Sequence, residues 1–196
     1  MKTTFLPGDA ILLVDVQNDF FPGGSLGVIE SDQIIPTLNY WLEKAKQANI
    51  PVFASRDWHP ADHISFKQRG GPWPAHCVQN TRGAAFHSQI RIPHSAIIIS
   101  KAFEQNKDSY SAFEGISVDK KTLADYIREL RIKRLWIGGL AQDYCVLAST
   151  LDACKITQLQ VIVDLNATRP VALETGEKAK AAMLQAGALL MEIEKQ

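Results

Sequence analysis

Short runs of apolar residues recur along the chain, each of a length that suits a strand buried on both faces. Ala10–Val14 is an unbroken run of this kind and predicts the first strand. Similar runs predict five more strands, the last from the weakest pattern, at Pro51–Ser55, Ala96–Ser100, Leu135–Leu140, Leu159–Val163 and Ala188–Ile193. Strands that are apolar throughout are typical of a parallel sheet with helices on both faces.

Between these runs, apolar residues repeat at the three- and four-residue spacing of a helix with one buried face. The first helix is expected to begin near Ser31 or Asp32, because Pro36 is tolerated only in a first turn. Three further helices are predicted at Leu123–Leu130, Val146–Cys154 and Leu173–Ala186, the last ended by Gly187. The alternation predicts an α/β protein with three α/β/α layers and a mostly parallel sheet of about six strands.

Residues 56–95 interrupt this alternation with a segment rich in glycine and proline that contains all five histidines. A loop-rich segment of about 40 residues is long for a compact domain, and such loops are usually functional or disordered. Its large aromatic residues, Trp58, Phe66, Trp73 and Phe86, favour an ordered loop. We therefore expect a single domain over residues 1–196 with a loop-rich insertion at about 56–95.

Composition and charge narrow the class of protein. The 196 residues are 46% hydrophobic and carry 21 basic and 21 acidic side chains, which excludes a disordered chain and gives no basic excess for nucleic acid or an anionic membrane. The sequence contains no signal peptide and no apolar run near 18 residues, so no membrane span is expected. Three cysteines make a disulfide framework improbable and predict a reducing, cytoplasmic setting.

Polar or reactive residues follow four of the predicted strands. Asp15 follows the first strand, Arg56 and Asp57 the second, Lys101 the third, and the segment Gly138–Cys145 the fourth. Ligands of parallel α/β sheets bind beyond the carboxyl ends of the strands, where these side chains are expected to meet in one cleft. The alternative is that each residue only caps the helix that follows it.

Cys145 is the candidate nucleophile, since it begins a helix after a glycine-rich turn. Asp143 is available to cap that helix, and the helix N-terminus and Lys101 are expected to lower the pKa of the thiol. Asp15 could accept the thiol proton, and backbone N–H groups of the turn could form an oxyanion hole. The alternative for a cysteine is a small buried apolar residue, which is our interpretation of Cys77 and Cys154.

A second set of residues has the composition of a metal site. Asp57 and His59 point to the same side of an extended segment, and His76 could add a third ligand. Two imidazoles and a carboxylate suit zinc, manganese or ferrous iron and leave coordination positions open. His63 is either a fourth ligand or a residue that supports the others. The alternative is that these are solvated loop histidines.

Aromatic residues near both sets, among them Phe20, Trp73 and Tyr110, could enclose a flat ring-shaped substrate. The alternative is that they belong to the ordinary core.

Several motifs occur together in one order: Leu13–Phe20 (LVDVQNDF), Gly23–Leu26 (GGSL), Arg56–Pro60 (RDWHP), His63, Trp73–Asn80 (WPAHCVQN), Lys101, Tyr110–Phe113 (YSAF) and Gly138–Val146 (GGLAQDYCV). With these motifs the chain resembles the nicotinamidases, a branch of the isochorismatase-like cysteine hydrolases, from Asp9 to about Ala188. The Asp-Trp-His and Trp-Pro-x-His elements are typical of the nicotinamidase branch, whereas many other members lack the metal ligands.

The resemblance implies an isochorismatase-like fold and a hydrolysis of nicotinamide to nicotinate and ammonia, as in NAD salvage, through a cysteine thioester; pyrazinamide is a further expected substrate. It implies a catalytic triad of Asp15, Lys101 and Cys145. It implies one divalent metal, expected to be zinc with manganese or iron as alternatives, on the ligands Asp57, His59 and His76, with His63 joining in some relatives. It also implies substrate contacts from Phe20, Leu26, Trp73, Tyr110 and Tyr144. Ala141 and Cys145 would supply the oxyanion hole from their backbone N–H groups, with a cis bond between Leu140 and Ala141.

Two departures from common versions of the family concern fine specificity. Gln142 stands where threonine is frequent, and Ala102-Phe103 follows Lys101 where some relatives have glycine. Two other functions are compatible with the sequence. One is an isochorismatase-like hydrolase of a different small amide or a vinyl ether, and the other is a non-catalytic metal-binding regulator of the same fold. Relatives occur as monomers and as homo-oligomers, and the apolar fraction of the chain does not separate the two.

Overall fold

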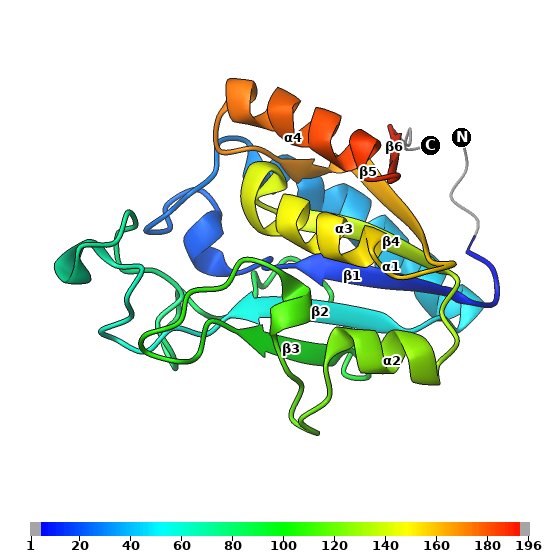
Figure 1. Cartoon of the computed structure of the whole chain (residues 1–196), viewed down its shortest axis with the longest axis horizontal. Helices are drawn as coiled ribbons and strands as arrows, with labels where there is room; N and C mark the ends of the chain where they lie inside the picture. The colour runs from blue at the N-terminus through cyan, green and yellow to red at the C-terminus, as the bar shows by residue number, and fades with distance from the viewer. Residues whose placement is uncertain (1–4, 193–196) are drawn as a thin grey trace.

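Six parallel strands form one sheet in the computed structural model, which describes residues 5–192 (Figure 1). They are β1 (Asp9–Val14), β2 (Val52–Asp57), β3 (Ile97–Lys101), β4 (Arg134–Leu140), β5 (Gln160–Arg169) and β6 (Leu189–Met191). Their order across the sheet is β3-β2-β1-β4-β5-β6, with parallel pairing throughout. The predicted α/β fold is confirmed.

Within the described residues, the α-helices are α1 (Ile35–Ala48), α2 (Leu123–Glu129), α3 (Leu147–Cys154) and α4 (Leu173–Gln185). Pro36 lies in the first turn of α1, after a 3₁₀ turn at Ser31–Ile34, as the sequence predicts. Thr122 begins α2 with a reciprocal cap, in which its hydroxyl accepts from the N–H of Asp125 and the Asp125 carboxylate accepts from the N–H of Thr122. Each helix therefore begins close to the position that its sequence pattern predicts.

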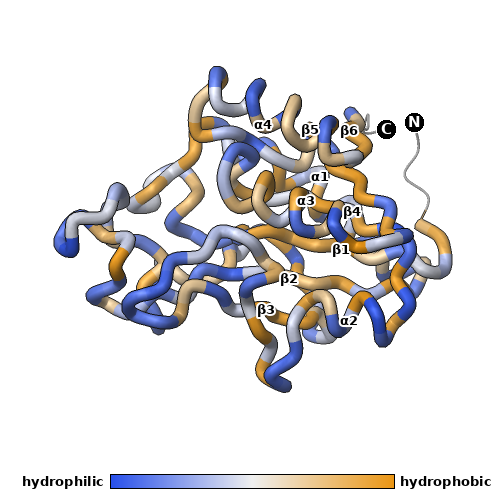
Figure 2. The backbone as a smooth tube through the Cα atoms, in the orientation of Figure 1, coloured by the Kyte–Doolittle hydropathy of each residue, from blue (hydrophilic) through white to orange (hydrophobic). Residues whose placement is uncertain are grey.

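The helices cover both faces of the sheet (Figure 1). Alternate residues of β1 point to opposite faces, so Ile11 and Leu13 pack in the same core as Trp41 of α1. Leu12 and Val14 pack in the second core, which contains side chains of α2, α3 and α4. Figure 2 shows the apolar stretches along the strands inside the molecule. The three predicted layers are present.

All six strands differ from their predicted bounds by one residue or more, and β5 differs most. The observed strand β5 extends beyond the predicted strand Leu159–Val163 as far as Arg169. This extension contains polar residues, which the apolar run did not include. The pairing of β5 with β4 shifts register beyond Ile137, so the apolar pattern does not mark this extension. The predicted strand Ala188–Ile193 is present as the short β6, and Ile193 lies outside the described residues.

The strands β1, β2 and β3 end at one edge of the sheet, where long loops gather on the left of Figure 1. Between β2 and β3 the described residues contain one short 3₁₀ turn, Lys67–Arg69. Arg56 and Asp57 belong to β2 itself, so the loop begins two residues later than the sequence suggested. No helix among residues 5–192 has the length and apolar character needed to cross a membrane.

Candidate active site

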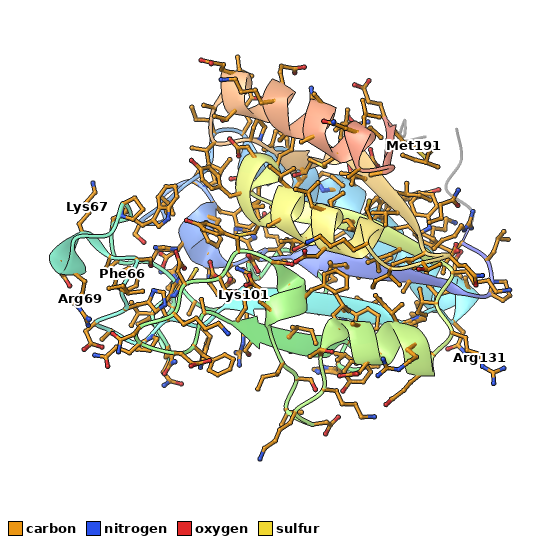
Figure 3. The ribbon with its side chains drawn as sticks, in the orientation of Figure 1. Phe66, Lys67, Arg69, Lys101, Arg131 and Met191 are labelled. Carbon is orange, nitrogen blue, oxygen red and sulfur yellow. The ribbon has the colours of Figure 1, made fainter. Side chains whose placement is uncertain are left out.

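Lys101, the last residue of β3, connects the polar residues that the sequence places at the strand ends (Figure 3). Its Nζ lies 3.0 Å from Asp15 Oδ2, 2.5 Å from Asp57 Oδ1 and 3.5 Å from Cys145 Sγ. All four side chains are buried, with Lys101 and Asp15 fully inaccessible. One buried cation therefore compensates two carboxylates and contacts the thiol, which brings the candidate catalytic residues together.

Asp15 is held in place by neighbouring strand ends. The Ser55 hydroxyl donates to Asp15 Oδ1 at 2.6 Å, and the Asp15 N–H donates to the Ser55 carbonyl at 3.2 Å. The Gln17 amide donates to the carbonyls of Asp57 and Ala84 and accepts from the Asp57 N–H at 2.8 Å. Ser55 and Gln17 received no role from sequence reasoning. The signal for Gln17 is its place in the LVDVQNDF motif, a polar residue two positions after Asp15, and the structure buries it.

The turn that presents Cys145 depends on a close approach between β4 and β1. Gly139 has φ +128°, and a Cβ there would lie 2.0 Å from the carbonyl oxygen of Val14. Only glycine fits this position. The Leu140–Ala141 peptide bond is cis, as the resemblance implied. The chain then winds through a π-helical turn, Gln142–Val146, directly into α3, so Cys145 lies at the entrance of a helix as expected.

Asp143 does not cap the helix of Cys145, contrary to the sequence expectation. Its carboxylate accepts from the N–H groups of Val171 and Ala172, at 2.9 and 3.4 Å, and from the Thr175 hydroxyl. These three donors belong to the start of α4, whose N-cap residue Ala172 provides no side-chain cap of its own. Asp143 therefore ties the first turn of α4 to the cysteine turn, a long-range contact that spacing along the chain does not reveal.

The pKa of Cys145 is shifted in the direction opposite to the one expected from the sequence. Burial raises the pKa of Cys145 well above its usual value, the charges of Asp15 and Asp57 add to this, and the opposite effect of Lys101 is outweighed. The predicted lowering of the thiol pKa is therefore wrong. Burial also raises the pKa of Asp15, despite Lys101. For Asp57, burial raises the pKa, but the charge of Lys101 and the nearby His59 ring outweigh it and the net pKa is lowered. These directions favour the protonated thiol of Cys145, and they make Asp15 the more basic of the two carboxylates.

Asp57, His59 and His76 converge in the way a metal site requires. Their ligand atoms all lie within 4.8 Å of one another. The Nδ1 atoms of the two rings donate to the carbonyls of Ala102 and Pro74, at 3.2 and 2.8 Å. This fixes the tautomer that leaves each Nε2 lone pair available, and the buried Nε2 of His59 has no hydrogen-bond partner. The three side chains therefore fit a divalent metal.

His63 lies next to this group without joining it. Its ring is 4.3 Å from that of His59. However, Nδ1 is 2.7 Å from the Ser65 hydroxyl and Nε2 is 3.0 Å from the Lys107 carbonyl oxygen. Both ring nitrogens thus have protein partners, and the His63 ring packs against the candidate ligand His59.

A small cavity of about 40 Å³ adjoins Cys145, Asp57 and His76. All five residues that the resemblance assigns to the substrate line it: Phe20, Leu26, Trp73, Tyr110 and Tyr144. The Trp73 indole donates to the Tyr110 hydroxyl at 2.9 Å and packs edge to face on Tyr144. Two further lining residues, Val28 and Val171, have no sequence motif around them and were missed. Ala141, assigned to the oxyanion hole, also faces this cavity.

The fold and this site define an α/β protein of the cysteine-hydrolase type. The sequence matches the isochorismatase domain over residues 9–195, and the chain belongs to the isochorismatase family.

Its similarity to characterised proteins is high over most of its length. A nicotinamidase of Acinetobacter baylyi is 39% identical over 165 residues, which cover 74% of each chain. The structure of a pyrazinamidase of Pyrococcus horikoshii in complex with zinc has a TM-score of 0.88 and 44% identity, over 95% of this chain and all of that one. The protein PnC1 of L. infantum in complex with nicotinate has a TM-score of 0.85 and 31% identity, over 97% and 96% of the two chains.

Proposed function

We propose that this chain is a metal-dependent cysteine amidohydrolase that converts nicotinamide to nicotinate and ammonia, and that it also accepts pyrazinamide. The observation that carries the proposal is the meeting of the Asp15–Lys101–Cys145 cluster with the Asp57–His59–His76 group at one cavity walled by aromatic rings. The relatives support it, since they include a nicotinamidase, a pyrazinamidase with zinc and a protein solved with nicotinate.

In the first half of the reaction, Asp15 accepts the proton of the Cys145 thiol as Sγ attacks the amide carbon. Ligand atoms of Asp15 and Cys145 lie within 4.8 Å of each other. The raised pKa of Asp15 makes it a stronger base than an ordinary carboxylate, which the raised pKa of the thiol requires. Collapse of the tetrahedral species breaks the C–N bond, Asp15 returns the proton to the departing ammonia, and a thioester remains.

In the second half, a water molecule attacks the thioester while Asp15 takes its proton. The C–S bond breaks, nicotinic acid leaves and gives up its proton to the solvent as nicotinate, and the proton on Asp15 passes to the thiolate of Cys145. Lys101 keeps Asp15 oriented throughout and compensates the negative charge that the pair carries at each stage. The backbone N–H groups of Ala141 and Cys145 would hold the oxyanion of both tetrahedral species.

The ring of the substrate would lie between the aromatic side chains of the cavity. The hydrogen bond from Trp73 to Tyr110 would fix the orientation of the indole ring. Asp57, His59 and His76 would hold the divalent metal, and zinc is the proposed ion. Such an ion supplies a fixed positive charge that orients a ring nitrogen and lowers the pKa of a bound water. We further propose that the chain is a single hydrolase domain and that the enzyme acts in the cytoplasm. Its metal ligands His59 and His76 lie on the loop after β2.

Ammonia release from nicotinamide by the purified, zinc-loaded protein tests the proposal, with Cys145→Ala and a chelated sample alongside. We expect release from the wild type, a loss of at least about 10³-fold in Cys145→Ala and a loss on chelation that zinc restores. Cys154→Ala is the matched control, because Cys154 lies on α3 away from the cavity. Undiminished turnover by Cys145→Ala would exclude the thioester. Turnover of another amide or a vinyl ether, with none of nicotinamide, would assign a different substrate to the same site.

A further inference from the structure

A second, far larger cavity lies beside the candidate active site. It is a groove of about 740 Å³ along β3, the outermost strand on its side of the sheet. Its volume is within the range of natural small-molecule sites. Apolar side chains of β3 form its base, and the residues that decide its chemistry are Arg56, Trp58, Phe103, Val118, Asp119 and Tyr126.

The groove runs along the edge of β3 and takes side chains from both faces of the sheet, Ile98 from the α1 face and Ile97 from the α2 face, and it shares no lining residue with the catalytic cavity. Arg56 pairs with Ser100 across β2 and β3, and Asp57 pairs with Lys101 at the next step. Because side chains alternate along a strand, Asp57 and Lys101 point to the catalytic cluster while Arg56 and Ser100 point to the groove. A ligand in the groove would therefore leave the catalytic cavity free.

Arg56 is a half-buried cation without an acidic partner. Its Nε donates to the Ser100 hydroxyl at 2.9 Å, and its guanidinium stacks 3.7 Å from the centre of the Trp58 ring. These contacts fix the plane of the guanidinium and leave its two terminal nitrogens unpaired within residues 5–192. Burial lowers the pKa of Arg56, as expected for a positive charge that has lost water and gained no counter-ion.

The chemistry of the walls selects among anions. A planar guanidinium with both terminal groups free matches the two oxygens of a carboxylate. Trp58, on the same face of the sheet as Arg56, and Phe103 provide aromatic surface for the body of such a ligand, whereas Tyr126 lines the groove from the α2 face. Asp119, which accepts a hydrogen bond from the Tyr126 hydroxyl at 3.1 Å, places a negative charge in the same groove. One cation and one carboxylate favour a singly charged ligand over a phosphate dianion.

We propose that this groove is a binding site for a small aromatic monocarboxylate, held by Arg56 and stacked among its aromatic walls. Binding does not depend on the reaction assigned to the other cavity, so failure of either assignment leaves the other intact.

Titration calorimetry of the purified, full-length protein with 2-naphthoate tests this site, because a carboxylate on two fused rings suits a groove of about 740 Å³ that contains Arg56. The neutral 2-naphthamide is the matched probe. We expect saturable one-to-one binding of 2-naphthoate and at least tenfold weaker binding of the amide, as loss of a charge-assisted hydrogen bond predicts. Equal affinities for the two probes, or no saturation at millimolar 2-naphthoate, would overturn the proposal.

Two variants locate the site. Arg56→Gln should weaken 2-naphthoate binding at least tenfold, whereas Arg131→Gln should not, since Arg131 is exposed and does not line the groove. Val118→Glu changes a side chain that is 94% exposed, so the fold is retained, and adds a negative charge to the groove. It should weaken binding of the acid and leave that of the amide unchanged. Wild-type affinity for 2-naphthoate in either Arg56→Gln or Val118→Glu would refute the assignment.

Discussion

The two halves of the candidate active site are positioned by different kinds of structure. Asp15 and Cys145 follow β1 and β4, and Lys101 ends β3; the register of these strands is fixed by continuous parallel pairing. His59 and His76 lie in the long loop after β2, which is held by isolated bridges, among them His59–Val78 and Phe66–Trp73, in place of a continuous strand pairing. The nucleophile centre is therefore placed by the sheet as a whole. The histidine ligands are placed by a few local hydrogen bonds, and their geometry is the easier of the two to disturb.

Lys101 is the residue at which the two halves meet, because it contacts Asp15 and Cys145 on one side and Asp57 on the other. A disturbance confined to the loop should change metal binding and spare the fold. A disturbance of Lys101 should affect the fold, the base and the metal ligand together. Variants can separate these two outcomes.

Lys101→Met should have the largest effect. It leaves Asp15 and Asp57 buried without their cation, and breaking a buried ion pair costs about 3–5 kcal/mol. We expect a loss of that size in the free energy of unfolding, measured by urea denaturation, and a fall in kcat/KM of at least about 10³-fold. Lys121→Met is the control, because Lys121 forms an exposed pair with Glu129. Equal denaturation midpoints for the two variants would show that Lys101 does not join the two halves.

His59→Ala and His63→Ala test the loop half alone. His59 offers an unpaired Nε2 to the ligand group, so its loss should lower zinc affinity by more than 100-fold and leave the unfolding midpoint little changed. His63 has both ring nitrogens on protein partners, so its loss should lower zinc affinity only about tenfold. Competition with a chelating dye measures both affinities. A loss in His63→Ala as large as that in His59→Ala would make His63 a direct ligand.

Val171 tests whether the cavity wall that comes from the α4 side selects the substrate. Its side chain lines the cavity and is 39% exposed, so its size limits substituents on the ring. Val171→Ala should raise kcat/KM for a ring-methylated nicotinamide about tenfold relative to nicotinamide itself. Leu173→Ala, at a neighbouring position that is 84% exposed, should leave this ratio unchanged. A ratio that moves equally in both variants would remove Val171 from the substrate wall.

The same contrast between sheet and loop explains what the sequence could predict. The apolar runs identify β1 and β4, and parallel pairing then brings Asp15 and Cys145 together without further information. His59 and His76 are candidate ligands by residue type alone, and the resemblance to nicotinamidases was needed to choose them. Contacts between distant segments stay hidden, as Gln17 shows by joining the end of β1 to Asp57 and Ala84. The direction of the Cys145 pKa was missed because burial is a property of the whole fold.

Substitution of Asp143 should have the smallest effect. Asp143 belongs to the turn that presents Cys145, but its carboxylate accepts hydrogen bonds from the start of α4. Its carboxylate takes the place of the missing side-chain cap by accepting from Val171, Ala172 and Thr175. Asp143→Ala should therefore lower the free energy of unfolding by about 1–2 kcal/mol, as loss of a helix cap does, in a urea titration.

Asp143→Asn should recover part of this loss, because its amide oxygen can still accept from one of the N–H groups. Turnover should fall far less than in Lys101→Met, because Asp143 holds the wall at Val171 and contacts neither Asp15 nor Lys101 in the described hydrogen bonds. Asp152→Ala is the control, since Asp152 forms an exposed pair with Lys155 on the same side of the sheet. If Asp143→Ala abolished turnover without lowering stability, Asp143 would belong to the catalytic half of the site. Asp143 would then count among the residues that react, and no longer among those that only hold the structure around the sheet.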